Sequence, residues 1–220
     1  MKKCLFLAII LPLCICPLSG CKKKPVEKFS ADEVVAAAKL KPAKDPIQEE
    51  IYAFRLKTRQ AYNRRQFDEL ETKARELRVA KPLFSNGSWK IAQFYESFEC
   101  RHDEPESMWQ LHDRIHHDWI AAKPDSVTAR VAYADFLVEY AWRARGSGFA
   151  DTVTKTGWRL FRERLASARS VLGEARRLPE KDPVWWLVAL FVARGESWTR
   201  MEYNALFAEA KAFAPTFLGL

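Results

Sequence analysis

The sequence predicts an all-α fold made of stacked helical hairpins, that is, a short α-solenoid. Apolar residues recur three and four positions apart in each segment from residue 46 onward, and this spacing places them on one face of a helix. No segment alternates apolar and polar residues with the period of two that is typical of a half-buried strand. Because short connections separate these segments, we expect one domain over residues 46–220, with consecutive helices as antiparallel neighbours.

The first helices are marked by their start signals. Asp45 is expected to act as an N-cap, with Pro46 at the first helical position and Gln48 closing a capping box. A break over residues 63–66 leads to a second helix, so the two are expected to form an antiparallel pair. Ser88 follows a turn and is expected to cap a third helix.

The middle of the chain predicts the central helix. Pro105 opens a helix whose inward residues are expected to be Met108, Leu111, His112, Ile115 and Trp119. Pro124 and Ser126 begin the next helix, which runs to Gly146. Because that helix is apolar on nearly all sides, it is expected to lie at the centre of the domain.

Three more helices are predicted in the C-terminal part. The first carries a long apolar stripe of Phe161, Leu165, Ala168, Leu172, Ala175 and Leu178. Asp182 and Pro183 then precede ten consecutive apolar residues, 184–193. Such a run is also compatible with a buried strand, but the start signal and the helical neighbours favour a buried helix. Gly195 ends it, and the last helix is expected over residues 198–213.

The last helix resembles the second helix of a tetratricopeptide-type repeat. Four of its residues stand at the offsets 0, 4, 7 and 12 that this repeat uses for alanine, an aromatic residue, alanine and proline, namely Tyr203, Phe207, Ala210 and Pro215. Ala168, Leu172 and Ala175 repeat the first three offsets. The resemblance implies a tetratricopeptide-like solenoid in which small residues let paired helices approach closely.

A closer resemblance covers roughly residues 50–217 and depends on the order of several short motifs. These are Gln66-Phe67-Asp68-Glu69-Leu70, Gly87-Ser88-Trp89-Lys90, Phe94-Tyr95, Ala141-Trp142-Arg143-Ala144-Arg145-Gly146-Ser147-Gly148, Gly157-Trp158, Asp182-Pro183 and Leu206-Phe207-Ala208-Glu209-Ala210. In this order they resemble the bacterial helical-repeat family known as domain of unknown function DUF4034. The resemblance implies a tetratricopeptide-like fold, and it implies no catalytic residue.

The N-terminus predicts an export signal that ends on a cysteine. Lys2 and Lys3 precede a short apolar run, which is closed by Leu18-Ser19-Gly20-Cys21. A membrane-spanning helix needs roughly 20 apolar residues, and this run has about half that number before Pro12. The arrangement resembles a bacterial lipoprotein signal, which implies that residues 1–20 are removed and that Cys21 is acylated and anchored in a membrane.

Residues 21–45 are expected to be the lipid anchor and a basic tether. Three lysines, Lys22 to Lys24, follow the anchor directly, where anionic headgroups attract cations. A short helix is expected from Ser30 to Leu40. The resemblance implies a location in the bacterial cell envelope, facing the periplasm. Because Lys22 is not an aspartate, the sorting rule of enteric lipoproteins favours the outer membrane over the inner one.

The charge and the cysteines constrain the class of protein. The formal net charge is +8, but the leader contributes two lysines and residues 22–45 contribute seven lysines against four acids, which leaves about +3 for residues 46–220. The excess basicity therefore belongs to the tether, and no nucleic-acid partner is expected. Of the five cysteines, only Cys100 remains in the domain, so we expect no internal disulfide and a packed, inert thiol.

One cluster has the residue types of a metal site. His112, Asp113, His116, His117 and Asp118 lie on one helix, and His112 and His116 are four residues apart. The segment lacks the glutamate that a zinc-protease helix places after its first histidine. Ligands from other helices are not recognisable, so we expect hydrogen-bonded helix residues here, with no metal and no cofactor.

Two aromatic sets are candidates for binding. The tryptophans of the C-terminal half are compatible with a ligand pocket, although such residues are usually core: Trp142, Trp158, Trp185, Trp186 and Trp198. Stacked hairpins expose a concave face, to which the central helix is expected to contribute Tyr133, Tyr140 and Arg143 as partner contacts. The structural alternative is that Tyr140 packs on Trp158 and that Arg143 caps helix carbonyls.

Three functions are compatible with these observations. The anchor and the repeat fold favour an envelope lipoprotein that acts as a protein-binding scaffold and is not an enzyme. An immunity-type lipoprotein that neutralises a toxin in the periplasm is a specialised form of that function. A metal-dependent hydrolase that uses His112 and His116 is the third.

Overall fold

The computed structural model describes residues 45–217, and this part of the chain is all-helical, as predicted. Its elements are α2 (Pro46–Asn63), α3 (Phe67–Ala80), α4 (Lys90–Glu96), α5 (Glu106–Ala122), α6 (Val127–Arg145), the short 3-10 helix η1 (Ala150–Thr152), α7 (Lys155–Arg177), α8 (Pro183–Gly195) and α9 (Arg200–Phe213). The export signal, Cys21, the tether and the helix expected after Ser30 lie outside the described residues.

Local capping explains most helix starts. The carboxylate of Asp45 accepts from the backbone N–H of Gln48 at 2.8 Å, and Ser126 caps α6 in the same way. Thr199 and Glu202 form a complete capping box at α9. The expected cap at Ser88 is wrong: its hydroxyl donates back to Asn86 at 2.6 Å, and α4 begins after Trp89 without a side-chain cap.

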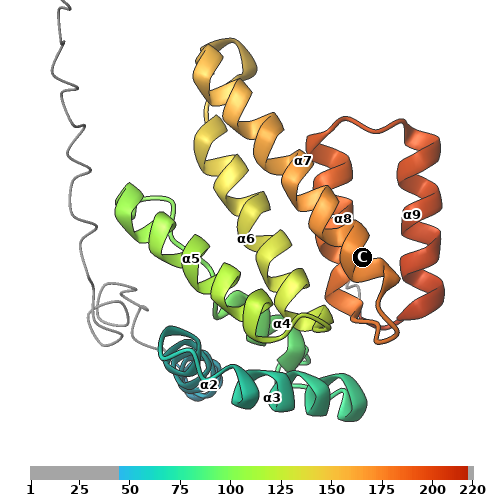
Figure 1. The fold of residues 1–220 in the computed structure, drawn as a ribbon. Helices are drawn as coiled ribbons and strands as arrows, with labels where there is room; N and C mark the ends of the chain where they lie inside the picture. The colour runs from blue at the N-terminus through green and yellow to red at the C-terminus, as the bar shows by residue number, and fades with distance from the viewer. Residues whose placement is uncertain (1–44, 218–220) are drawn as a thin grey trace, which may run out of the picture.

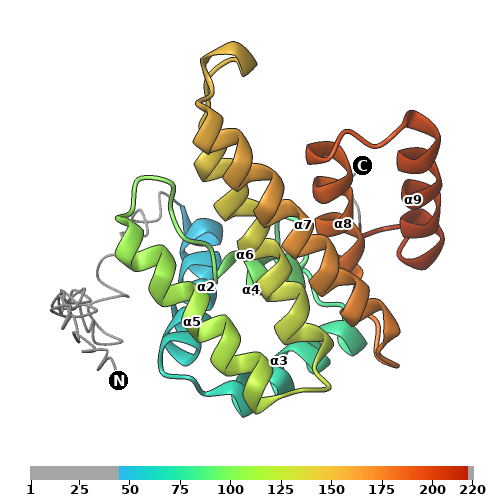
Figure 2. The ribbon, with the colours of Figure 1, turned by 45° about the horizontal axis from the view of Figure 1, so that its top comes forward.

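Helices α5, α6 and α7 lie side by side in antiparallel order, and α8 and α9 form a further antiparallel pair (Figure 1, Figure 2). Helix α6 lies between α5 and α7 and buries residues on nearly all sides, as its sequence predicts. Stacked hairpins are compatible with this arrangement, and the tetratricopeptide-type repeat remains a prediction.

The expected antiparallel pairing of α2 and α3 is wrong. Figure 1 looks almost along α2, whereas α3 runs across the view, and α4 packs against both helices. The connection contains Arg65 in the left-handed conformation, with φ of 57°. Two residues after it, the ring of Phe67 stacks on Trp119 of α5 at 5.7 Å, which holds the start of α3 against α5.

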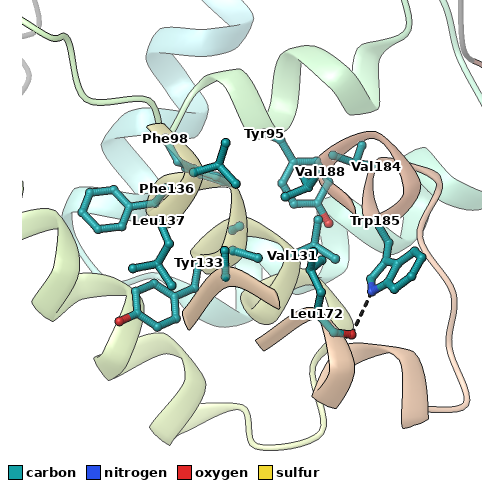
Figure 3. Packing of buried hydrophobic residues seen from close by; sticks show 14 of the residues in the cluster. Tyr95, Phe98, Val131, Tyr133, Phe136, Leu137, Leu172, Val184, Trp185 and Val188 are labelled. Atoms are coloured by element: carbon teal, nitrogen blue, oxygen red, sulfur yellow. Dashed lines mark hydrogen bonds between the residues drawn. The ribbon is translucent and has the colours of Figure 1, made fainter. Parts of the chain in front are cut away.

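One apolar core runs through the described helices. Figure 3 shows its centre, where Val131 of α6 and Leu172 of α7 meet the face of α8 that carries Val184 and Val188. The indole N–H of Trp185 donates to the carbonyl oxygen of Leu172 at 2.9 Å, which satisfies a polar group that is cut off from water.

The apolar run of α8 is only partly buried, which corrects the expectation of a buried helix. Val184, Val188 and Val192 face the core, but Trp186 and Leu187 are half-buried and Phe191 is exposed. The reason is the position of α8 near the end of the row, where α9 covers only part of its outer side. Among residues 45–217, no helix is long and apolar enough to cross a membrane.

Candidate functional site

The three predicted partner contacts all lie on α6 at its packing surface with α5. Tyr133 is 9% exposed, and its hydroxyl donates to the carboxylate of Asp113 at 3.1 Å and lies 2.9 Å from Nε2 of His117. The side chain therefore holds α6 against α5. Its role as a partner contact stays a prediction.

Tyr140 and Arg143 form a second link between the same two helices. The Tyr140 ring stacks on Trp109 at 4.9 Å, so the alternative of packing on Trp158 is wrong. Arg143 pairs with the carboxylate of Glu106, which also accepts from the Tyr140 hydroxyl, and it donates to the carbonyl oxygen of Glu104 at 3.1 Å. Arg143 thus binds backbone carbonyl oxygen, as the structural alternative expects, but in the loop before α5.

The electrostatics of this link follow from its hydrogen bonds. Burial alone would raise the pKa of Glu106, but the hydrogen bonds from Tyr140 and Arg143 outweigh it and hold that pKa below its usual value. Burial and the hydrogen bond to Glu106 raise the pKa of Tyr140 to about 12. The carboxylate and the phenol are therefore held ionised and neutral, respectively, which suits a structural hydrogen bond.

His112 and His116 are completely buried, and a buried cation lies beside them. Nη2 of Arg59 lies 2.8 Å from Nε2 of His112, and the same guanidinium donates to the carbonyl oxygens of Ser97 and Glu99. Since arginine only donates, Nε2 of His112 must be the accepting nitrogen, which places the proton on Nδ1.

Neither histidine is charged at neutral pH. Burial first, and then the positive charge of Arg59, lower the pKa of His112 well below its usual value and that of His116 to about 3. The His116 ring lies among Tyr62, Tyr133 and Phe136. These surroundings are those of aromatic core residues.

The geometry does not assemble the metal cluster. Over residues 45–217, no group of three or more His, Cys, Asp or Glu side chains is placed to hold an ion. His117 is exposed and faces Tyr133, whereas His112 faces the guanidinium of Arg59. A catalytic zinc ion needs three protein ligands and an open position, and this arrangement provides neither at His112 and His116.

Cys100 is buried and makes a single polar contact. Its thiol donates to the carboxylate of Glu104 at 3.2 Å. Burial, and then the neighbouring carboxylate, raise the pKa of the thiol far above its usual value. The thiolate that a nucleophile requires is therefore disfavoured, in agreement with the packed thiol expected from the sequence.

The predicted tryptophan set does not form one pocket, because some of its members lie in the core and others border a groove. Trp185 is in the core and Trp186 stacks on Phe213 at 4.1 Å, but Trp158 and Trp198 border an open groove of about 570 Å³. One wall is α7 and the other is the end of α8 with the connection to α9. We call this the α7/α8 groove, and it is lined by Trp158, Phe161, Arg162, Leu165, Ala166, Arg169, Gly195, Glu196, Ser197 and Trp198.

Gly195 brings the two walls of the α7/α8 groove together. A Cβ atom at this position would lie 2.6 Å from Cδ1 of Leu165, so any larger residue would have to displace the buried Leu165 side chain. In the sequence Gly195 reads only as a helix stop. The contact between Gly195 and Leu165 therefore could not be predicted from the local sequence.

The two arginines of the α7/α8 groove differ in their ion pairing. Nε of Arg169 lies 3.4 Å from the carboxylate of Glu196, which also accepts from the Trp198 indole at 3.1 Å. Arg162 makes no hydrogen bond or ion pair within the described part of the chain. The groove therefore presents one unpaired guanidinium and one that shares a single carboxylate.

A second hollow of about 320 Å³ lies between α3, the start of α8 and the segment after α9. It is lined by three cations, Arg78, Lys81 and Lys181, beside Trp89 and Phe213. However, Arg78 pairs with Asp182 and Glu180, and Lys181 donates to two carbonyl oxygens at the end of α7. Arg78 and Lys181 are therefore already paired with groups of the domain itself.

Comparison with known proteins provides no relative: no family model, no curated protein and no solved structure gives a significant match. The resemblances to bacterial lipoproteins and to DUF4034 therefore stay predictions from the sequence.

Proposed function

We propose that this chain is a lipid-anchored protein of the bacterial cell envelope whose helical domain binds another envelope protein. The observation that carries the proposal is Leu18-Ser19-Gly20-Cys21, which directly follows a basic and apolar leader. Acylation of Cys21 would tether the domain to a membrane, and the lysines at 22–24 would add about 1 kcal/mol each at an anionic surface.

The arrangement of the helices supports a binding role. Antiparallel helices stacked in a row leave long outer surfaces exposed, and such surfaces are used for protein recognition. An orientation toward the periplasm, with the outer membrane favoured, follows from the leader and from Lys22. Tyr133, Tyr140 and Arg143 remain proposed contacts, although their polar groups already bind α5 residues.

No observation in the structure favours the other two functions over this one. An immunity-type role would be indicated by a toxin gene beside this gene. A hydrolase that uses His112 and His116 is disfavoured by their complete burial beside Arg59.

The anchor is tested with labelled fatty acid in cells that express the full chain. The wild type should incorporate the label and fractionate with membranes, whereas Cys21→Ser should do neither. A wild-type chain that stays unlabelled and soluble contradicts the proposal. Crosslinked capture of a partner from membranes by the intact lipoprotein tests the binding role, and a folded lipoprotein that captures no protein contradicts it.

A further inference from the structure

The positive charge of the domain is concentrated on one helix. Helix α7 carries seven basic and two acidic residues, a net charge of +5, whereas residues 46–220 together carry only about +3. The rest of the domain is therefore slightly acidic. Since α7 forms one wall of the α7/α8 groove, this groove lies in the most positive part of the domain.

Two guanidinium groups are available to a ligand in this groove. Arg162 is exposed and unpaired within residues 45–217. The side chain of Arg169 is 60% exposed and shares only one carboxylate, at 3.4 Å. Guanidinium groups bind carboxylates with two parallel hydrogen bonds, so both positions suit a carboxylate-bearing ligand.

The remaining lining is apolar and aromatic. Phe161 and Leu165 lie beneath the groove and are almost completely buried, so the apolar surface that a ligand can reach comes from Trp158, Ala166 and Trp198. Exposed tryptophan and arginine side chains on one surface are the residue types that carry most of the binding energy in protein interfaces. A free anion would satisfy the arginines but leave this apolar surface uncovered.

We infer that the α7/α8 groove binds an acidic segment of a partner protein, one that presents carboxylates to Arg162 and Arg169 and an apolar side chain to the surface of Trp158 and Trp198. This inference rests on the proposed function and names the surface and the partner chemistry of that same scaffold. Anionic lipid headgroups are the competing ligand, and the experiment below separates the two.

The test uses the purified full-length chain to select binders from a displayed library of random short peptides. Selected peptides should be enriched in Asp and Glu together with an apolar residue. Their affinity should fall by about tenfold or more in Arg162→Glu, the scale expected for an interface arginine. The matched control is Arg177→Glu, which makes the same charge change on an exposed residue of α7 outside the groove and should leave affinity within about twofold.

Three results would overturn the inference: selected peptides without acidic enrichment, equal weakening by Arg162→Glu and Arg177→Glu, or displacement of the peptide by phosphatidylglycerol vesicles but not by phosphatidylcholine vesicles. Circular dichroism and the melting temperature confirm that both variants fold. If the intact Arg162→Glu lipoprotein still captures its membrane partner normally, the scaffold function stands and the groove assignment fails.

Discussion

Arg78 of α3 and Asp182 at the start of α8 form a buried ion pair that joins the two ends of the domain. The atoms Nη1 and Oδ2 lie 2.9 Å apart, and the side chains are 7% and 0% exposed. The same carboxylate accepts from the Tyr95 hydroxyl at 2.7 Å, and its other oxygen caps α8 at Val184. One residue therefore starts a helix and also fixes α8 against α3 and α4.

Removal of this carboxylate should destabilise the domain strongly. Asp182→Ala leaves the Arg78 guanidinium buried with only Thr128 and Glu180 as side-chain partners, and it removes the cap of α8. We expect a loss of about 3–5 kcal/mol in the free energy of unfolding, measured by urea titration. The control is Asp118→Ala, which breaks the exposed pair with Arg65 and should cost about 1 kcal/mol or less. Equal losses in the two variants would show that burial does not determine the effect.

The core is tested by two leucines of adjacent helices. Leu172 of α7 is buried in the core that Figure 3 shows, so Leu172→Ala should cost about 2–5 kcal/mol. Leu187 lies in the longest apolar run of the sequence but is only half-buried, and Leu187→Ala should cost clearly less. The midpoints of urea unfolding compare them directly, and the reverse order would contradict the observed burial.

The helix starts and the apolar faces of the helices follow from local sequence. The caps at Asp45, Ser126 and Asp182 could be predicted because each involves residues within three positions along the chain. The all-round burial of α6 followed in the same way from its composition. Caps and apolar faces depend on residues that are close together in the sequence, so the sequence alone predicts where helices begin and which faces are apolar.

Contacts between distant segments were not predictable. The sequence shows that Tyr140 is aromatic, but only the structure shows that its partner is Trp109 rather than Trp158. Likewise, the pairing of Arg78 with Asp182 spans 104 positions. The α7/α8 groove depends on the meeting of Gly195 with Leu165. Such pairings depend on how helices pack, which periodicity does not specify.

The buried histidines should make the domain sensitive to acid. His112 and His116 have lowered pKa values in the folded state, whereas in the unfolded chain they titrate near the ordinary value of about 6.5. Below that pH the unfolded state binds more protons, so stability falls as the pH falls. At pH 5 the loss should reach about 2 kcal/mol for His116 relative to neutral pH, and His112 should add to it in the same direction.

This prediction is checked by urea unfolding at pH 7 and pH 5. His116→Phe places an aromatic ring among Tyr62, Tyr133 and Phe136 without a titratable group, so it should reduce the acid-induced loss. The matched control is His102→Phe, since His102 is exposed. An acid-induced loss in His116→Phe as large as that in the wild type would contradict the prediction, because this comparison cancels the opposite contribution of Asp135 over the same pH range.

Asp135 of α6 should have the opposite pH dependence. Burial, and then the nearby carboxylates of Glu139, Glu99 and Glu96, raise its pKa to about 8. Because an aspartate in the unfolded chain titrates near pH 4, the folded state binds the extra proton between about pH 4 and pH 8. The stability associated with this proton is complete at low pH and is lost as the pH rises toward 8.

Replacement of Asp135 by asparagine removes this titration while it keeps the shape of the side chain. Asp135→Asn should therefore be more stable than the wild type at pH 8, and the difference should shrink as the pH is lowered toward 4, as measured by urea midpoints across this range. Asp151→Asn, in the exposed η1 turn, changes the net charge equally and serves as the control. If both variants gain the same stability at pH 8, the effect comes from net charge. A gain confined to Asp135→Asn means that the effect comes from the buried carboxylate and its neighbours. In that case Glu139→Gln should give part of the same gain in stability, because it removes the neighbouring carboxylate with the largest effect on the pKa of Asp135.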